Sequence, residues 1–172
     1  MPEATDTITI RVPISLKEKL EDTSKQNQLT LNLFINQILT QKFHWDEHVS
    51  KMGWLQFDPC VVRDIFDFLD DEEISKLAKS TKPETIRVIK FIYGDASLSN
   101  IIDFIKSWLN NAHISYRYTE DPNSHKFLVN HTLGVNWSKF CIKVSEEFLQ
   151  ELGYPIHDLN AEKNSYGFTI MK

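Results

Sequence analysis

The hydrophobic pattern changes period within the first twenty residues. Ile8, Ile10 and Val12 alternate with polar residues, which is the period of a β-strand. After Pro13 the apolar residues recur at intervals of three and four, which indicates helices. A short strand with no second strand nearby leaves half of its backbone groups unpaired. The pattern therefore predicts a strand whose partner is not supplied by the neighbouring sequence.

Two helices are predicted after this strand. Ser15 and Glu18 match the S-x-x-E capping box, so the first helix is expected to begin at Ser15 and to end near Asn27, which can adopt a left-handed conformation. Thr30 is a suitable N-cap for the second helix, which is expected to continue until Gly53. Its apolar stripe consists of Leu31, Phe34, Ile35, Ile38, Leu39 and Phe43. A monomer of this size cannot bury that stripe by itself.

The order strand, short helix, turn and longer helix within residues 1–48 resembles the ribbon-helix-helix family of DNA-binding proteins. The resemblance is carried by Ile8-Thr9-Ile10-Arg11-Val12-Pro13, by Leu16 and Leu20, and by Thr30-Leu31-Asn32-Leu33-Phe34-Ile35. The turn of that family reads roughly Gly-x-Ser-x-Ser before the second helix. Here Gln28 stands in the place of the glycine, and Thr30 and Asn32 stand in the places of the two serines.

The resemblance implies a homodimer in which two chains pair their strands into an antiparallel ribbon that enters the major groove of double-stranded DNA. The side chains expected to face outward and read bases are Thr7, Thr9 and Arg11. Those expected in the dimer core are Ile8, Ile10, Val12, Phe34 and Ile38. The start of the second helix, at Thr30, Leu31 and Asn32, is expected to bind a phosphate through backbone N–H groups.

The charge of this segment leaves a second interpretation open. Residues 1–45 contain five basic residues (Arg11, Lys17, Lys19, Lys25, Lys42) and five acidic ones (Glu3, Asp6, Glu18, Glu21, Asp22), whereas a DNA reader normally carries a positive excess. Thr and Arg are also common on the solvated face of any sheet. The alternative is a dimerising protein-interaction module without DNA binding, such as an antitoxin-like protein or an adaptor.

The sequence gives only weak indications of metal binding and of catalysis. His44 and His48 lie four residues apart on one predicted helix face, a spacing that can bind a transition metal, although such pairs are usually ordinary surface residues. Cys60 and Cys141 lie far apart in apolar segments, as expected of buried thiols in a reducing compartment. No glycine-rich phosphate loop, H-E-x-x-H motif or paired-cysteine motif occurs. We expect no cofactor, no resident metal and no enzymatic activity.

Residues 54–172 predict a second, larger α+β domain. Helices are expected from Asp58, from Asp70, from about Pro83 and from about Ser97. The remainder predicts a β-β-α-β antiparallel unit. Its last strand contains Tyr166, Phe168 and Ile170, and residues 156–159 are a possible partner for that strand. We assign this domain to sensing or oligomer contacts, with an unknown ligand or protein partner.

The phrase His131-Thr132-Leu133-Gly134-Val135-Asn136-Trp137-Ser138 loosely resembles a strand-to-helix turn in C-terminal sensor or output domains of archaeal regulators. Gly134 is expected to make the turn, Asn136 or Ser138 to cap the helix, and Trp137 to pack beneath it. His131 has two possible roles, which are contact with a ligand or partner chain and fixation of the turn by hydrogen bonds to the backbone. The second role is the commoner one for such a residue.

Composition is consistent with a globular protein outside the disordered and membrane classes, with 41% hydrophobic and 25% charged residues and a net charge of −5 among 172 residues. No apolar stretch approaches the ~20 residues that span a bilayer, and no signal-peptide pattern is present. The sequence therefore predicts a cytoplasmic, nucleoid-associated, dimeric regulator of transcription, acting by occupancy of an operator as a repressor does.

Overall fold

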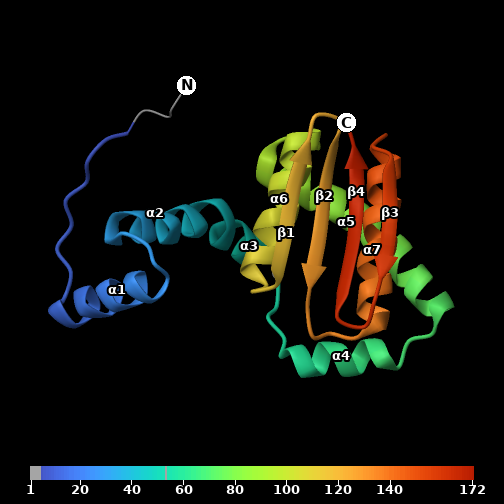
Figure 1. Cartoon of the computed structure of the whole chain (residues 1–172), viewed down its shortest axis with the longest axis horizontal. Coiled ribbons are helices and arrows are strands. Elements are labelled where there is room, and N and C mark those ends of the chain that lie inside the picture. The colour runs from blue at the N-terminus through green and yellow to red at the C-terminus, as the bar shows by residue number, and fades with distance from the viewer. Residues whose placement is uncertain (1–4, 53) are drawn as a thin grey trace. The chain divides into compact units, whose positions relative to one another are not determined.

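The computed structural model describes residues 5–52 and 54–172, except for the side chains of residues 44, 49 and 50. The chain divides into two compact units, Met1–Gly53 and Trp54–Lys172, which we call the N-terminal and C-terminal units. The protein is of the α+β class, with helices in both units and a four-stranded antiparallel sheet in the C-terminal unit (Figure 1). Within the described ranges, no helix combines the length and apolar character needed to cross a membrane.

The described part of the N-terminal unit is helical after residue 13. It contains α1 (Ile14–Gln26), α2 (Leu31–Gln41), a π-helical turn η1 (Lys42–Asp46) and α3 (Glu47–Met52). Residues 5–13 form no regular secondary structure in this single chain, so the strand expected around residues 7–12 is not shown. Such a strand needs a hydrogen-bonded neighbour, which the described residues of one chain do not supply.

The predicted start of α1 is wrong by one residue. The helix begins at Ile14 with Pro13 at the N-cap, where the Pro13 carbonyl accepts from the amides of Leu16 and Lys17, both at 3.1 Å. No side chain caps this end, so the predicted capping box of Ser15 and Glu18 does not form. Proline is tolerated at the start of a helix because its fixed φ is compatible with the first turn.

The C-terminal unit begins with three helices, α4 (Pro59–Asp67), α5 (Asp71–Tyr93) and α6 (Leu98–Asn111). The predicted cap at Asp58 is confirmed, because its carboxylate accepts from the Cys60 amide at 2.7 Å. Asp70 caps α5 in a reciprocal capping box with Glu73, which explains the acidic run there without a metal.

Pro83 does not start a helix, contrary to the prediction, but lies within α5. Proline removes one backbone hydrogen bond from a helix interior and usually ends or kinks the helix. Here the helix continues because its apolar face is buried on both sides of the proline, at Ile74, Ala78, Ile86, Val88 and Ile89. Packing therefore outweighs the local preference of proline.

The sheet is built from two hairpins joined by a helix. β1 (Ser115–Asp121) and β2 (Ser124–Asn130) form the first, α7 (Val135–Glu151) follows, and β3 (Ile156–Ala161) and β4 (Ser165–Met171) form the second. The strand order is β1-β2-β4-β3, and all neighbours are antiparallel. The unit is thus β-β-α-β-β, and the possible pairing of residues 156–159 with the last strand is confirmed, because these residues lie in β3 and pair with β4.

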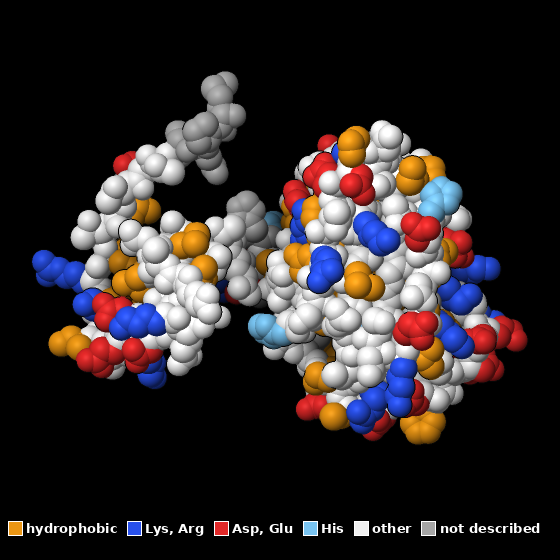
Figure 2. Space-filling model, viewed as in Figure 1, with side chains coloured by type: hydrophobic (Ala, Val, Ile, Leu, Met, Phe, Trp, Pro, Cys, Tyr) orange, Lys and Arg blue, Asp and Glu red, His pale blue; other side chains and the backbone are white. Residues whose placement is uncertain are grey.

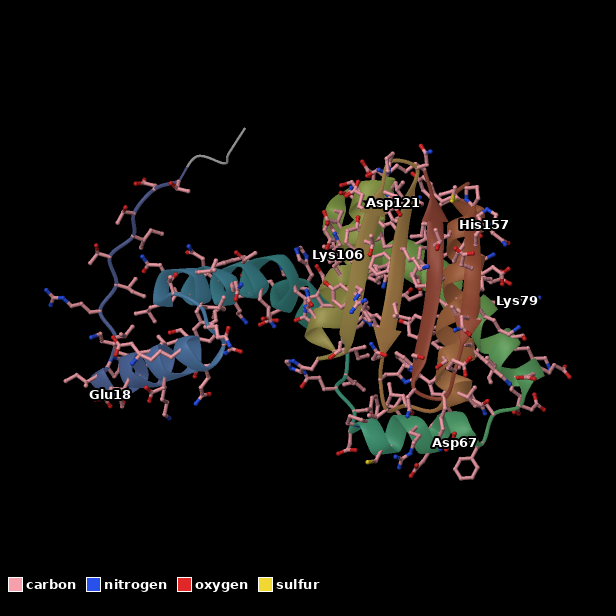
Figure 3. The ribbon with its side chains drawn as sticks, viewed as in Figure 1. Glu18, Asp67, Lys79, Lys106, Asp121 and His157 are labelled. Atoms are coloured by element: carbon pink, nitrogen blue, oxygen red, sulfur yellow. The ribbon has the colours of Figure 1, made fainter. Side chains whose placement is uncertain are left out.

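One face of the sheet carries the core. The β1–β2 and β2–β4 registers place Tyr118, Phe127 and Phe168 side by side, and the rings of Phe127 and Phe168 lie 5.3 Å apart. Figure 1 shows α5, α6 and α7 behind this sheet, and Lys106 of α6 (labelled in Figure 3) places its Nζ 3.6 Å from the ring centre of Tyr118. The opposite face is open, and in Figure 2 its charged side chains are scattered among polar and backbone atoms.

The two edges of the sheet are irregular or charged. β1 carries Arg117, Glu120 and Asp121 along an edge, and Lys172 bonds to Glu120 at 3.0 Å. On the other edge, the pairing of β3 with β4 shifts register between His157 and Asn160. These features limit each edge strand to its single partner.

Candidate DNA interface and ligand pocket

The segment before α1 exposes both of its alternating sets of side chains. Ile8, Ile10 and Val12 are all exposed in the single chain, with Ile10 at 60%. The predicted base readers Thr7, Thr9 and Arg11 are exposed as well. An exposed run of β-branched residues has no stabilising role in an isolated chain, so it is available for pairing with another strand.

The turn between α1 and α2 has a residue in the left-handed region. Gln28 has φ +57°, whereas Asn27, which the sequence suggested for this conformation, has φ −85°. The Leu29 amide donates to the carbonyl of Ser24 at 2.9 Å, which closes the turn. A positive φ favours glycine, and Gln28 is the position at which the ribbon-helix-helix pattern has glycine.

The start of α2 is a capped helix N-terminus. Thr30 is the N-cap, as predicted, and its side chain accepts from the Leu33 amide at 3.3 Å. The Phe34 amide donates to the Thr30 carbonyl at 2.9 Å. The amides of Leu31 and Asn32 come before the first intrahelical bond, so helix geometry leaves them able to bind an anion. The predicted phosphate-binding residues therefore form one helix N-terminus.

The apolar face of α2 is not buried in the single chain. None of the residues of α2 is buried, although Phe34 and Ile35 are partly covered and Ile38 and Leu39 are exposed. Figure 2 shows hydrophobic side chains on the surface of this unit. A helix with such a stripe is stable in water when another surface covers it.

The metal candidates lie at the end of this unit. His44 lies in η1 and His48 in α3, but the side chain of His44 is outside the described residues. Among the side chains that are described, no three of His, Cys, Asp or Glu are grouped closely enough to hold a metal ion. The expectation of no resident metal, with His44 and His48 as weak candidates, stays a prediction.

The C-terminal unit contains an apolar pocket of about 320 Å³, which the sequence did not predict. Its walls come from α5, α6, α7 and β4, together with Trp54. Aromatic side chains dominate the lining: Trp54, Phe104, Trp108, Phe140, Phe148, Tyr166 and Phe168. The polar lining groups are Thr81, Glu84, Thr85, Ser145 and the thiol of Cys141. Pockets of this size and character are typical of small-molecule sites.

Two titratable groups of the pocket are deeply buried. Burial raises the pKa of the Cys141 thiol and of the Tyr166 hydroxyl, and a hydrogen bond between the two side chains adds to the rise at Tyr166. Both groups are therefore neutral at pH 7. A neutral thiol is a poor nucleophile, so Cys141 is suited to packing and hydrogen bonding and not to covalent catalysis.

His131 lies beside the pocket wall and fixes a turn, as its commoner predicted role requires. The Leu133 amide donates to Nδ1 of His131 at 3.0 Å, so the proton of the neutral ring lies on Nε2 and is donated to Ser138 Oγ at 2.8 Å. Ser138 in turn donates to the carbonyl of Glu162 at 2.6 Å. Burial lowers the pKa of His131, which favours this neutral state.

The expected cap of the following helix is not formed. Gly134 occupies the N-cap of α7 with φ +86°, and no side chain caps the helix. Asn136 instead donates to the carbonyls of Phe66 and Leu69, at 3.1 and 3.0 Å, and so holds the end of α4. Trp137 is buried as predicted and lies edge-on to the His131 ring, with centroids 4.6 Å apart.

No protein-family model and no curated protein matches this chain. The assignment of function therefore depends on the geometry of the two units and on the residue pattern of the first.

The two cysteines of the C-terminal unit differ in exposure, which gives a direct test of its packing. Cys141 is buried as expected, whereas Cys60 is exposed, so the expectation of two buried thiols is wrong for Cys60. With a thiol-specific reagent at pH 8, we expect Cys60 to react first and Cys141 to react at least roughly 100-fold more slowly, because burial excludes the reagent and the raised pKa of Cys141 removes thiolate. Mass spectrometry of peptides over a time course measures both rates, and equal rates would contradict the buried position of Cys141.

Proposed function

We propose that this protein is a homodimeric, sequence-specific DNA-binding regulator of transcription, with an N-terminal ribbon-helix-helix arm. The observation that carries the proposal is the apolar surface of the N-terminal unit. An alternating strand-type segment and the stripe of α2 are both uncovered in one chain. A second copy of the chain, related by a two-fold axis, would pair its strand-type segment with that of the first copy. The dimer would cover the apolar stripe of α2 in both copies.

The turn between α1 and α2 and the start of α2 support the proposal independently. The left-handed residue Gln28 coincides with the glycine of the family pattern. The free first-turn amides at Leu31 and Asn32 suit a phosphate of the DNA backbone. In such a ribbon, Ile8, Ile10 and Val12 point to the shared core, and Thr7, Thr9 and Arg11 point to the major groove, because neighbouring strand residues face opposite sides.

The proposed mechanism is occupancy of an operator, with repression where the operator overlaps a promoter. Arginine donates two hydrogen bonds to guanine, and threonine offers a hydroxyl and a methyl group to base edges. Because the arm has balanced charges, we expect a modest affinity for a single dimer and a gain from dimers bound side by side. The C-terminal unit is proposed to sense a ligand or to hold neighbouring dimers together.

A second candidate is favoured by that same charge balance. It is a dimerising interaction module whose arm never contacts DNA. The two candidates share the dimer and differ at Arg11, which would be a base reader in the first and a solvated side chain in the second.

Replacement of Arg11 by alanine distinguishes the candidates. On duplex DNA from upstream of the protein's own gene, we expect the variant to lose roughly 1–3 kcal/mol of binding free energy for each arginine contact, a rise of about ten-fold or more in Kd. Fluorescence anisotropy at low and near-physiological salt measures the change.

Arg117→Ala is the matched control, because it removes the same charge from an exposed position in β1 of the C-terminal unit. It is expected to bind DNA like the wild type. Equal losses in the two variants would indicate a general charge effect. Absence of DNA binding by a dimer confirmed by sedimentation would reject the regulator and favour the interaction module.

A further inference from the structure

The pocket of the C-terminal unit has features that restrict what can fill it. The space lies among α5, α6, α7 and β4 and measures about 320 Å³, near the lower end of the ~300–1,000 Å³ found for ligand sites. An apolar cavity of ~150 Å³ takes up one benzene ring. Twice that volume accommodates two or three rings.

The lining favours flat, apolar ligands. Phe104 and Trp108 on α6 and Phe140 and Phe148 on α7 present aromatic rings from facing helices. Offset or edge-on contact with such rings stabilises an aromatic guest beyond the gain from burial alone. A flexible aliphatic chain would gain less from these contacts and would lose more conformational freedom.

The charges of the lining disfavour an anionic ligand. Lys, Arg and His are absent from the described lining, and Glu84 is its one carboxylate. The pKa of Glu84 is lowered by Arg87, which bonds to it and is itself exposed, so this carboxylate is ionised at pH 7. An acid entering the pocket would lose its hydration without gaining a cationic partner.

Two neutral groups in the wall can still orient a polar atom of the guest. The Tyr166 hydroxyl and the Cys141 thiol are buried and hydrogen-bonded to each other. A hydroxyl has one donor and two acceptor positions, so the bond to Cys141 leaves two of these three positions on Tyr166 for other hydrogen bonds. Ser145 and Thr85 add hydroxyl groups from opposite helices.

We propose that the C-terminal unit binds a small uncharged aromatic molecule of two or three rings in this pocket, in contact with Trp54 and Trp108. The site deepens the sensing role proposed above by naming the class of ligand. It does not require DNA binding, so either proposal can fail while the other stands.

Two dyes that share one skeleton test the charge and the shape requirement together. N-phenyl-1-naphthylamine is uncharged, and 8-anilinonaphthalene-1-sulfonate has the same rings with an added sulfonate. In fluorescence titrations of the full-length protein, we expect the uncharged dye to bind one site per chain, at least ten-fold more tightly than the sulfonate. Equal affinities, or no saturable binding of the uncharged dye, would overturn the proposal.

Filling the pocket tests its location. Ser145→Phe adds a ring inside the lining of α7, and Ser80→Phe adds the same ring at an exposed position of α5 outside the lining. We expect the first variant to weaken uncharged-dye binding at least ten-fold and the second to leave it unchanged. Thr85→Phe fills the space from the opposite wall. Dye binding is measured with this variant instead if Ser145→Phe lowers the melting temperature.

The dye pair decides the proposal even if neither filled variant folds. Unchanged dye binding in a folded filled variant would place the dye elsewhere and contradict the site. If the dye is displaced as the protein concentration rises, a second copy of the chain occupies the pocket. That result would also overturn the proposal.

Discussion

Replacement of Ile10 by lysine is expected to convert the proposed dimer to a monomer. Ile10 is 60% exposed in the single chain, so a second chain could bury it. Burial of an isoleucine contributes roughly 1.5–3 kcal/mol, and each dimer would contain two copies at the ribbon, so the loss is on the order of 3–6 kcal/mol. This corresponds to a dissociation constant raised about 100-fold or more. Sedimentation velocity over a range of concentrations measures it.

Thr9→Lys is the matched control, because it adds the same charge at the neighbouring position. In the proposed ribbon this side chain points to the opposite face, toward solvent or DNA. It should therefore leave the dimer intact. If Ile10→Lys sediments as a dimer at the same concentrations as the wild type, the N-terminal segment is not the dimer interface, and the ribbon is rejected.

Truncation of Phe127 to alanine is expected to cause the largest loss of stability. Phe127 is fully buried in β2, where its ring contacts those of Tyr118 and Phe168, at 5.1 and 5.3 Å between centroids. Removing a buried phenylalanine ring costs roughly 3–5 kcal/mol, because the apolar contacts are lost and a cavity remains. Since domains are stable by only about 5–15 kcal/mol, the C-terminal unit would be close to unfolding. Urea denaturation followed by near-UV circular dichroism measures the loss.

Leu128→Ala provides the comparison from the next residue of the same strand. Leu128 faces the open side of the sheet and is 41% exposed, so its truncation should cost less than about 1 kcal/mol. Similar losses in the two variants would contradict the burial of one sheet face only.

Periodic patterns predicted most elements of the C-terminal unit, and local exceptions account for the errors. The strand pair around residues 115–130 and the capped helix at Asp58 follow from alternation and from an N-cap with a following proline. The split of α5 at Pro83 failed because tertiary packing outweighs the preference of one residue. Residues 156–159 were expected as the partner of the last strand, and β3 extends this segment to Ala161 across a register shift, near which Asp158 has φ +52°.

The ligand pocket could not be predicted, because its residues look like ordinary core residues. Phe104 and Trp108, and Phe140, Val144 and Phe148, recur at helical spacing, which predicts burial against a neighbour. Whether facing aromatic stripes interlock or leave a space depends on the distance between helices, which a single sequence does not specify. The proposed DNA-binding arm is the opposite case, since its candidate residues follow from the pattern and a second chain is needed to test them.

The edges of the C-terminal sheet affect the tendency of the protein to aggregate. Charged side chains along β1 and the irregular register of β3 hinder the addition of further strands, which is how sheets grow into fibrils. The N-terminal segment is less protected, since Arg11 is the single charged residue among residues 7–12 and the β-branched Ile8, Ile10 and Val12 are exposed in the single chain. If the proposed dimer were dissociated in a concentrated stock, the protein would therefore be expected to aggregate through residues 7–12 and not through the sheet of the C-terminal unit.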